Sequence, residues 1–299
     1  AMKSHIQQQE LRNQQMQLHA QQMQEGELAL QKNRQMLQDQ TAARTSVASG
    51  LFASDPQEKD YAVGDLDLDG DEDLVIVRKQ PGTTTGAFPN VLLMNVNGVL
   101  TDQTTLYASA SLVATSQGFL DATNDRDVVV ADVNGDGWPD LVTATTLGGL
   151  AAPKHITHPR IYINQGNNAA GLWQGFLFDD ENRAPTMPTE PRFCALAAGD
   201  IDQDGDLDLY FGDYQQGPYA RPQDLDDRLW INDGLGYFTD QTATRMTTVM
   251  TESSFAMTVA MLDMNQDGWL DILKDDALNA PQGISISYQN PMQPGHFNA

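Results

Sequence analysis

The chain has 299 residues, of which 40% are hydrophobic, and a formal net charge of −24 at pH 7. This charge excludes nucleic-acid binding through a basic surface, because proteins of that class carry positive patches. The single cysteine, Cys194, excludes an intrachain disulfide. The sequence contains no run of 18 apolar residues, so a membrane-spanning helix is not predicted.

Residues 1–26 form a glutamine-rich segment of low complexity. Glutamine has good helix propensity, and no proline or glycine precedes Gly26, so a helix is one prediction. The apolar residues do not keep a 3.6-residue period, which favours a polar arm that is ordered only when packed on something. A role in assembly is the alternative. Residues 27–299 are predicted to form a repeat region.

One acidic pattern, D-x-[DN]-x-D-G-x-x-D-[LI], occurs four times in the repeat region. The copies begin at Asp65, Asp132, Asp200 and Asp263, which are 67, 68 and 63 residues apart. The corresponding loops are residues 65–73, 132–140, 200–208 and 263–271. A single copy would be consistent with an acidic surface turn. Four copies with the same residue types at the same offsets indicate a shared chemistry and a repeat architecture.

The chemistry of these loops is the binding of a hard cation. Side-chain oxygens at positions 1, 3, 5 and 9, together with the carbonyl at position 7, suit Ca²⁺ better than Mg²⁺. No loop contains Cys or His, which argues against zinc. We therefore predict about four structural Ca²⁺ ions. The predicted ligands are Asp65, Asp67, Asp69, Asp71, Asp73, Asp132, Asn134, Asp136, Trp138, Asp140, Asp200, Asp202, Asp204, Asp206, Asp208, Asp263, Asn265, Asp267, Trp269 and Asp271.

The EF-hand is the competing interpretation, because its loop begins in the same way. An EF-hand needs a glutamate at position 12 and a helix on each side. Position 12 is Ile76, Thr143, Phe211 and Lys274 in the four copies. Short β-branched runs such as 128–131 and 141–145 flank the loops and indicate strands. The sequence therefore predicts calcium loops between strands and excludes EF-hands.

A second motif, Asp-Gln-Thr, follows a pair of apolar runs joined by an Asn/Gly turn. Each period therefore contains about four strands, two around the calcium loop and two around the Asn/Gly turn. The motif occurs at residues 39–41, 102–104 and 240–242. Residues 28–42 are predicted to be the last hairpin of an earlier unit, and residues 284–297 that of the fourth. Repeated four-stranded units predict an all-β fold of propeller-type blades.

The four loops, together with the L-x-x-N-x-G-x-G-x-F-x-D-x-T hairpin of residues 229–242, resemble the FG-GAP/VCBS repeats. Such repeats occur in integrin α-subunit heads and in secreted bacterial proteins of the cartilage-acidic-protein type. The resemblance covers about residues 27–299 and implies a calcium-binding β-propeller outside the cell. Propellers of this family usually close with about seven blades. The four blades predicted here leave three arrangements open: a piece of a larger ring, a ring or filament completed by other subunits, or a closed four-bladed ring.

The sequence contains no G-x-S-x-G, P-loop or zinc-protease motif, so no enzyme activity is predicted. Cys194 is predicted to be a buried structural thiol. His155 and His158 are predicted to lie in an exposed loop. The ligand-facing loops are predicted at residues 80–86, 148–158, 179–191 and 215–227. Aromatic and basic residues in or near them that could contact a ligand are Trp173, Tyr214, Tyr219 and Arg221.

The predicted function is that of a secreted or cell-surface, calcium-stabilised binding, adhesion or scaffold module. Millimolar extracellular calcium fits solvent-reachable loops of this kind. The partner is a protein, a glycan or other copies of the chain, with neither nucleic acid nor a membrane span involved. One alternative is a self-assembling protein that forms rings or filaments. A carbohydrate-binding lectin or polysaccharide lyase is the other.

Overall fold

A computed structural model describes residues 58–79, 87–146, 153–187, 191–213, 226–251, 256–276 and 283–297. All of these belong to one unit of the chain, Pro56–Ala299. The predicted glutamine-rich arm and the predicted hairpin at residues 28–42 lie outside the described residues. No helix in the described part is long and apolar enough to cross a membrane.

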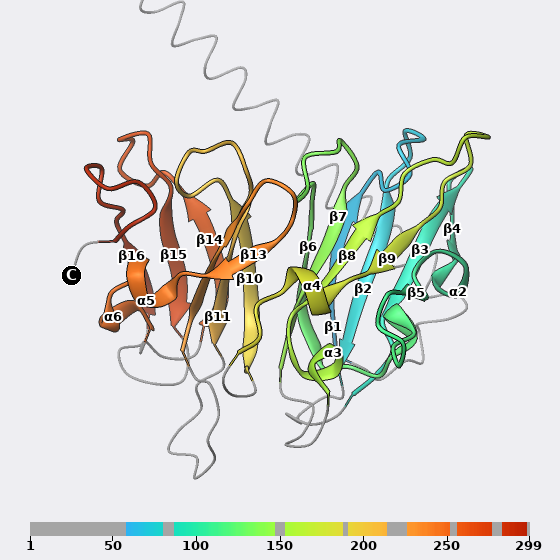
Figure 1. Ribbon diagram of the computed structural model, residues 1–299, viewed down its shortest axis with the longest axis horizontal. Helices are drawn as coiled ribbons and strands as arrows, with labels where there is room; N and C mark the ends of the chain where they lie inside the picture. The colour runs from blue at the N-terminus through green and yellow to red at the C-terminus, as the bar shows by residue number, and fades with distance from the viewer. Residues whose placement is uncertain are drawn as a thin grey trace, which may run out of the picture. The chain divides into compact units, whose positions relative to one another are not determined.

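The described residues form four sheets, each with one acidic loop between its first two antiparallel strands (Figure 1). The first and third sheets each contain four antiparallel strands in chain order. The first consists of β1 (Glu58–Gly64), β2 (Asp73–Lys79), β3 (Val91–Val96) and β4 (Val99–Asp102). The third consists of β10 (Phe193–Gly199), β11 (Asp208–Asp213), β12 (Arg228–Asn232) and β13 (Phe238–Asp240).

The second and fourth sheets vary this plan. The second consists of β6 (Asp125–Ala131), β7 (Asp140–Thr145), β8 (Arg160–Asn164) and β9 (Phe176–Phe178), with β5 (Ala110–Ser111) parallel to β9. The fourth consists of β14 (Ala256–Leu262), β15 (Asp271–Asp276) and β16 (Gly283–Ser287). Its fourth strand is reduced to an isolated bridge between Gln289 and Phe297. The all-β fold of propeller-type blades is confirmed, with three strands instead of four in the last described sheet.

The helices of the described part are all short and follow or connect strands. They are α2 (Thr104–Tyr107), η1 (Gly118–Leu120), α3 (Lys154–Thr157), α4 (Asp180–Arg183), α5 (Thr242–Arg245) and α6 (Thr248–Thr251). The Asp-Gln-Thr motif explains how α2 and α5 are attached. The Asp102 carboxylate accepts hydrogen bonds from Thr104 N and Oγ1 at 3.0 and 2.7 Å, and Thr104 Oγ1 accepts one from Leu92 N at 2.9 Å. The equivalent residues of the third sheet repeat all three contacts.

Adjacent sheets pack face to face in chain order, β1 against β6, β6 against β10 and β10 against β14. The first two sheets occupy the right half of Figure 1 and the last two the left half. We call the face that a sheet turns toward the next sheet its forward face, and the opposite side its back face. Val75 and Leu92 on the forward face of the first sheet belong to one cluster with Leu141 and Tyr162 of the second. Equivalent clusters join the second sheet to the third and the third to the fourth.

This stacking explains why β7 and β11 are buried along their whole length instead of alternating between buried and exposed residues. Every residue of β7 and of β11 is buried, because a neighbouring sheet covers each face. Such a strand appears in the sequence as a continuous apolar run, as in Leu141–Val142. The largest fully buried side chain, Trp230, lies between the second and third sheets and packs against Phe211 with ring centroids 4.6 Å apart.

Two carboxyl groups meet where the first strands of the first two sheets pack together. Asp127 accepts hydrogen bonds from Val128 N at 2.8 Å and from Leu196 N of the third sheet at 2.7 Å. Burial, and next the charge of Asp60, raise the pKa of Asp127 to about 7. Burial also raises the pKa of Asp60, against the effect of its hydrogen bonds from Tyr61 N and Asp127. Near neutral pH the pair therefore shares a proton.

We predict that this pair makes the protein less stable at pH 8 than at pH 5. Carboxyl groups whose pKa is raised on folding stabilise the native state at low pH, and that contribution is lost as the pH rises through about 7. Asp60→Asn replaces the repulsion by an amide that can donate to Asp127, so the fall in melting temperature between pH 5 and pH 8 becomes smaller. Calorimetry at fixed, saturating Ca²⁺ measures this. An unchanged pH dependence in the variant would contradict the shared proton.

Candidate metal centre

Each acidic loop connects the first strand of a sheet to the second. β1 ends at Gly64 and β2 begins at Asp73, so position 9 of the first loop already belongs to a strand. The other three loops have the same placement. Because strands flank all four loops, the structure contains the loop-between-strands arrangement that the sequence predicted in place of an EF-hand.

The four loops share one backbone conformation. Position 6 is glycine in every loop, with φ between 88° and 100°, where a residue with a Cβ is strained. Position 4 is left-handed as well, with φ of 57° at Leu68, 69° at Gly135, 60° at Gln203 and 63° at Gln266. The sequence predicted the turn at position 6 but not the one at position 4. The two left-handed residues bend the loop back so that its side chains face one another.

The position-1 carboxylate holds the loop in this shape. Asp65 Oδ1 accepts a hydrogen bond from Asp69 N and Asp65 Oδ2 one from Gly70 N, both at 3.0 Å. Asp69 Oδ1 in turn accepts one from Asp71 N at 2.9 Å. The other loops repeat all three contacts at 2.8–3.1 Å. The loops are therefore organised by their own hydrogen bonds, and each carboxylate oxygen keeps a further lone pair.

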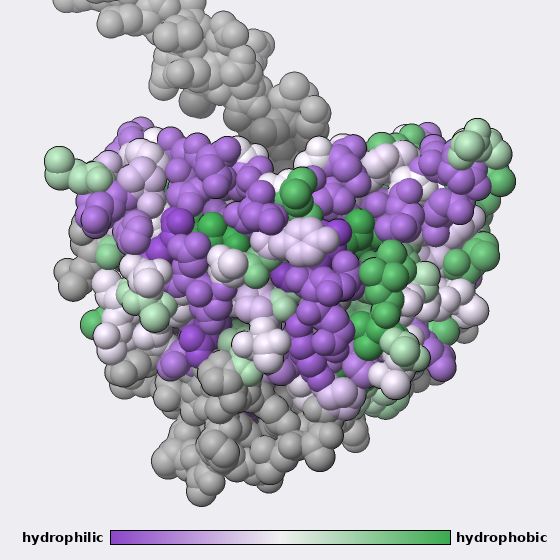
Figure 2. Space-filling model, viewed as in Figure 1, coloured by the Kyte–Doolittle hydropathy of each residue, from purple (hydrophilic) through white to green (hydrophobic). Residues whose placement is uncertain are grey.

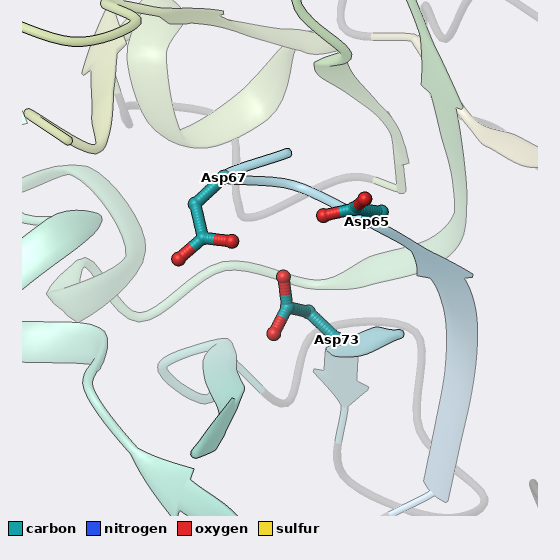
Figure 3. A group of neighbouring side chains, drawn as sticks. All are labelled: Asp65, Asp67 and Asp73. Atoms are coloured by element: carbon teal, nitrogen blue, oxygen red, sulfur yellow. The ribbon is translucent and has the colours of Figure 1, made fainter. Parts of the chain in front are cut away.

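Three carboxylates of the first loop converge. One oxygen each from Asp65, Asp67 and Asp73 lies within 4.8 Å of the other two, and the three groups face a shared space (Figure 3). The third loop forms the equivalent group from Asp200, Asp202 and Asp208. The position-5 carboxylates, Asp69 and Asp204, lie outside these groups. The loops thus bring positions 1, 3 and 9 together.

The second and fourth loops differ because position 3 is asparagine. Asn134 Nδ2 donates to Asp136 Oδ2 at 2.9 Å, and Asn265 Nδ2 donates to Asp267 Oδ2 at 3.0 Å. Each of these loops has three aspartates, whereas the first and third have five. The neutral amide stands in place of one carboxylate and donates a hydrogen bond to another, so these loops carry less negative charge. The four loops therefore form two chemical classes that alternate along the chain.

The position-9 aspartate is buried in all four loops and ties the loop to the third strand. Asp140 Oδ2 accepts a hydrogen bond from Val133 N at 3.0 Å, and Oδ1 accepts one from Asn164 N at 2.7 Å. The other loops repeat both contacts at 2.7–3.2 Å. Burial raises the pKa of Asp73, Asp140 and Asp208 to about 7, and the backbone hydrogen bonds oppose that shift.

The residue that binds the position-9 carboxylate also joins neighbouring sheets. Asn164 Nδ2 donates to Leu66 O, in the loop of the first sheet, at 2.8 Å, and to Pro139 O of its own loop at 3.0 Å. Asn232 and Gln289 donate in the same way to the position-2 carbonyl of the preceding sheet, at 2.7 and 2.8 Å. Sequence analysis missed this role, although Asn232 stands in the L-x-x-N motif. The acceptors lie 98 and 99 residues before Asn164 and Asn232, so no local pattern connects them.

The residues present fit a hard divalent cation. Every side-chain donor at positions 1, 3, 5 and 9 is an oxygen, and the burial of position 9 is compensated best when a cation neutralises the group. In the first loop, Asp65, Asp67 and Asp73 would hold the ion. In the third loop, Arg245 lies 2.9 Å from Asp202 and competes for it. Ligation by the position-7 carbonyls remains a prediction.

The histidines are buried, so the prediction of an exposed loop is wrong. His155 and His158 lie in and directly after α3, which packs against α4. His158 Nδ1 lies 2.9 Å from Thr157 Oγ1. Burial lowers the pKa of His158 to about 4. The prediction failed because residues 154–157 form a helical turn, α3, that packs against α4, and this packing buries both histidines.

Cys194 and Trp173, which the sequence analysis singled out, both make contacts within the fold. Cys194 Sγ donates to Ala256 O, and burial raises the pKa of the thiol, in agreement with a structural role. Trp173 packs on Tyr107 and Phe176, and its Nε1 donates to Asn164 Oδ1 at 2.8 Å. Trp173 therefore holds in place Asn164, the residue that links the second sheet to the loop of the first. The other residues suggested for ligand contact, Tyr214, Tyr219 and Arg221, lie outside the described residues, as does loop 80–86.

The FG-GAP-like repeat matches the chain three times, at residues 65–143, 132–211 and 200–273. Each match begins at the first aspartate of one acidic loop and extends beyond the next loop. Together the matches span residues 65–273, which is more than half of the chain and includes all four acidic loops. A comparison with curated proteins gave no match.

We predict that Asn232→Leu lowers the free energy of unfolding by about 2–4 kcal/mol. The change removes four hydrogen bonds, two to carbonyls and two from glycine N–H groups, and each buried group left without a partner costs about 1–3 kcal/mol. Denaturant unfolding at saturating Ca²⁺ measures the effect.

The matched control is Asn95→Leu at the same position of the first sheet. Asn95 Nδ2 donates to Glu72 O of its own loop at 3.3 Å, and no described residue of a preceding sheet accepts from it. We expect this control to lose less than half as much stability. Equal losses of stability for the two variants would contradict a stabilising link between sheets through the Asn232 side chain.

Proposed function

The chain belongs to the FG-GAP-like repeat family, and we propose that it is an extracellular, calcium-stabilised binding or scaffold module without enzyme activity. The observation that carries the proposal is the fourfold repetition of one acidic loop with the same internal hydrogen bonds. A random acidic surface would not repeat the position-1, position-5 and position-9 contacts in four places.

Calcium is the cation that we propose for these loops. The donors are hard oxygens in a flexible loop, and Mg²⁺ would demand a tighter octahedron. When bound, the ion supplies positive charge to the clustered carboxylates of a chain whose net charge is −24. The aspartates at positions 1 and 9 are oriented by hydrogen bonds from backbone N–H groups, so little ordering is needed at the moment of binding.

The proposed location outside the cell follows from affinity. Loops that are largely exposed to solvent bind Ca²⁺ weakly, and extracellular Ca²⁺ is roughly millimolar, which matches extracellular modules of this type. Outside the cell, disulfides usually stabilise proteins, but this chain has only Cys194. Bound metal would take over that stabilising role.

We propose a binding role instead of catalysis because the groups that could act as nucleophile or base are engaged in other interactions. The Cys194 thiol is held protonated by burial, and the loop carboxylates accept backbone hydrogen bonds. A protein partner is favoured over a glycan because Trp173, the described aromatic residue considered for sugar stacking, packs inside the second sheet.

We predict that chelation lowers the melting temperature markedly, and that two variants of the third loop separate metal binding from structure. Asp204→Asn keeps an oxygen that can accept the hydrogen bond from Asp206 N and removes only the charge offered to the metal, so its effect should disappear in excess EDTA. Asp208→Asn disturbs the buried group that holds Ile201 N and Asn232 N, so it should destabilise with and without EDTA. Calorimetry in Ca²⁺ and in EDTA compares them. A wild-type melting temperature that EDTA leaves unchanged would mean that the loops are acidic turns only.

We also predict that the first loop binds Ca²⁺ more tightly than the second, because it has five aspartates against three. Asp67→Asn leaves four aspartates and should weaken the first site toward the affinity of the second loop. The reverse change, Asn134→Asp, removes the amide that competes for Asp136 and should tighten the second loop. Isothermal titration calorimetry measures both. Affinities that do not respond to the exchanged residues would contradict ligation at position 3.

A further inference from the structure

The third acidic loop has an arginine side chain beside it. Asp202, at position 3, forms an ion pair with Arg245 of α5, and Asp202 Oδ2 lies 2.9 Å from Arg245 Nη1. Both side chains are only 13% exposed, so solvent screens this pair less than it screens an exposed one. Asp67, at position 3 of the first loop, has no basic partner within the described residues. The two loops with five aspartates therefore differ in their charge balance.

Asp202 also differs in its hydrogen bonds from the position-3 residues of the other loops. In those loops the position-3 oxygen accepts a hydrogen bond from the position-5 N–H at 3.0–3.3 Å, at Asp67, Asn134 and Asn265. In the third loop, Asp204 N donates to Asp200 Oδ1 at 3.1 Å and, among the described residues, makes no bond to Asp202. Asp202 Oδ1 is buried and accepts no hydrogen bond within the described residues. Asp202 is therefore held by Arg245 and not by the backbone of its own loop.

The fold fixes Arg245 in this place. Arg245 Nε donates to Gln241 Oε1 at 2.7 Å, and Arg245 O accepts a hydrogen bond from Phe297 N at 2.9 Å. Gly295 lies directly against the ion pair, because a Cβ at this residue would overlap Arg245 Nη1 and lie 2.8 Å from Asp202 Cβ. The guanidinium group is thus positioned by its neighbours, which reduces the entropy lost when the ion pair forms.

The position of Arg245 can be compared in the first three sheets. After the last strand of each sheet, one backbone N–H donates to the third strand at 3.0–3.1 Å, at Gln103, Asp179 and Gln241. Four residues later stand Tyr107, Arg183 and Arg245. The two arginines end α4 and α5, which lie on the face shown in Figure 1, and hydrophilic side chains cover much of the described part of that face (Figure 2).

Arg183 lies beside the second loop but faces no carboxylate at position 3. A Cβ at Gly236 would lie 2.8 Å from Arg183 Nη1 and 3.4 Å from Asn134 Cβ, which repeats the arrangement around Gly295. Asn134 is neutral, and Arg183 Nε forms its ion pair with Asp179 at 3.1 Å. Among the first three loops, an arginine at this place and an aspartate at position 3 therefore occur together only in the third.

We propose that Arg245 is an internal counter-ion of the third loop, which Ca²⁺ has to displace from Asp202. The inference rests on the calcium binding proposed above and adds that two loops with equal numbers of aspartates differ in affinity. One oxygen of Asp202 lies within 4.8 Å of oxygens of Asp200 and Asp208, so the arginine and the ion use the same carboxylate. The guanidinium charge also repels the ion. The third loop therefore binds Ca²⁺ more weakly than the first, and its carboxylates are partly neutralised without metal.

The test is a Ca²⁺ titration of the full chain labelled with ¹⁵N-glycine and followed by NMR. The position-6 glycines report on single loops, because each N–H donates to the position-1 carboxylate at 2.8–3.1 Å, at Gly70, Gly137 and Gly205. We expect the Gly205 signal to respond at a higher Ca²⁺ concentration than the Gly70 signal. Arg245→Met removes the charge and keeps a long side chain, so it should lower the Gly205 midpoint about fivefold and leave the Gly70 midpoint unchanged.

Arg183→Met is the matched control, because it removes the same group from the equivalent position of α4 beside a neutral residue. It should leave the Gly137 midpoint unchanged. The Asp202→Asn variant provides a second test, since Arg245→Met should no longer lower the Gly205 midpoint in that background. In excess EDTA, Arg245→Met should lower the melting temperature more than it does at saturating Ca²⁺, because only the metal-free loop uses the arginine as its counter-ion.

The outcomes separate this inference from calcium binding itself. If the Gly70 signal responds to Ca²⁺ but Arg245→Met leaves the Gly205 midpoint unchanged or raises it, the inference is overturned and the proposed function stands. An equal lowering of the midpoint in the Asp202→Asn background, or by the control variant in its own loop, would overturn it as well. If none of the three glycine signals responds at millimolar Ca²⁺, the proposed function fails and the inference fails with it.

Discussion

The fold depends on one buried carboxylate per sheet, the aspartate at position 9 of each acidic loop. Its two oxygens accept backbone N–H groups from the loop and from the third strand, as Asp140 does with Val133 and Asn164. A buried carboxylate is unfavourable unless it is hydrogen-bonded and its charge is balanced. Here the hydrogen bonds supply the first condition, and the second creates the demand for a cation in the adjacent loop. The position-9 aspartate therefore connects the shape of the loop, its attachment to the third strand and the need for a bound cation.

The same residue also explains how neighbouring sheets are held in register. The asparagine whose N–H reaches the position-9 carboxylate extends its side chain to the loop of the preceding sheet, as Asn232 does to Val133 O at 2.7 Å. Each of the first three loops is thus linked to the next sheet by the hydrogen bond of one carboxamide side chain. In Gln289 the carboxamide is one methylene longer and makes the same contacts at 2.8 and 2.9 Å. The contact tolerates a change of side-chain length because the carboxamide group itself carries the interaction.

Much of this arrangement could be predicted from sequence because it is local. The spacing of the loop aspartates and the β-branched runs beside them predicted the loops between strands, and the Asp-Gln-Thr motif marked the last hairpin of the first and third sheets. Three features could not be predicted. The left-handed conformation at Leu68 has no glycine to indicate it, the acceptor of Asn164 is 98 residues away, and the burial of His158 depends on α3 packing against α4. The last two depend on contacts between separate segments of the chain, whereas Leu68 lies in a loop whose own hydrogen bonds impose the conformation.

The structure also explains why the sequence does not determine the number of sheets. The contact between neighbouring sheets is built three times from the same elements: a position-2 carbonyl, a carboxamide and apolar residues on two strands. A repeated contact of this kind determines how one sheet follows another, but nothing in it determines where the series stops. In the fourth sheet the last strand is reduced to a bridge at Gln289, and Tyr288 is exposed where its counterpart in the third sheet, Ile231, is buried. The sheet thus keeps the apolar chemistry of the repeated contact while its edge departs from the four-strand plan.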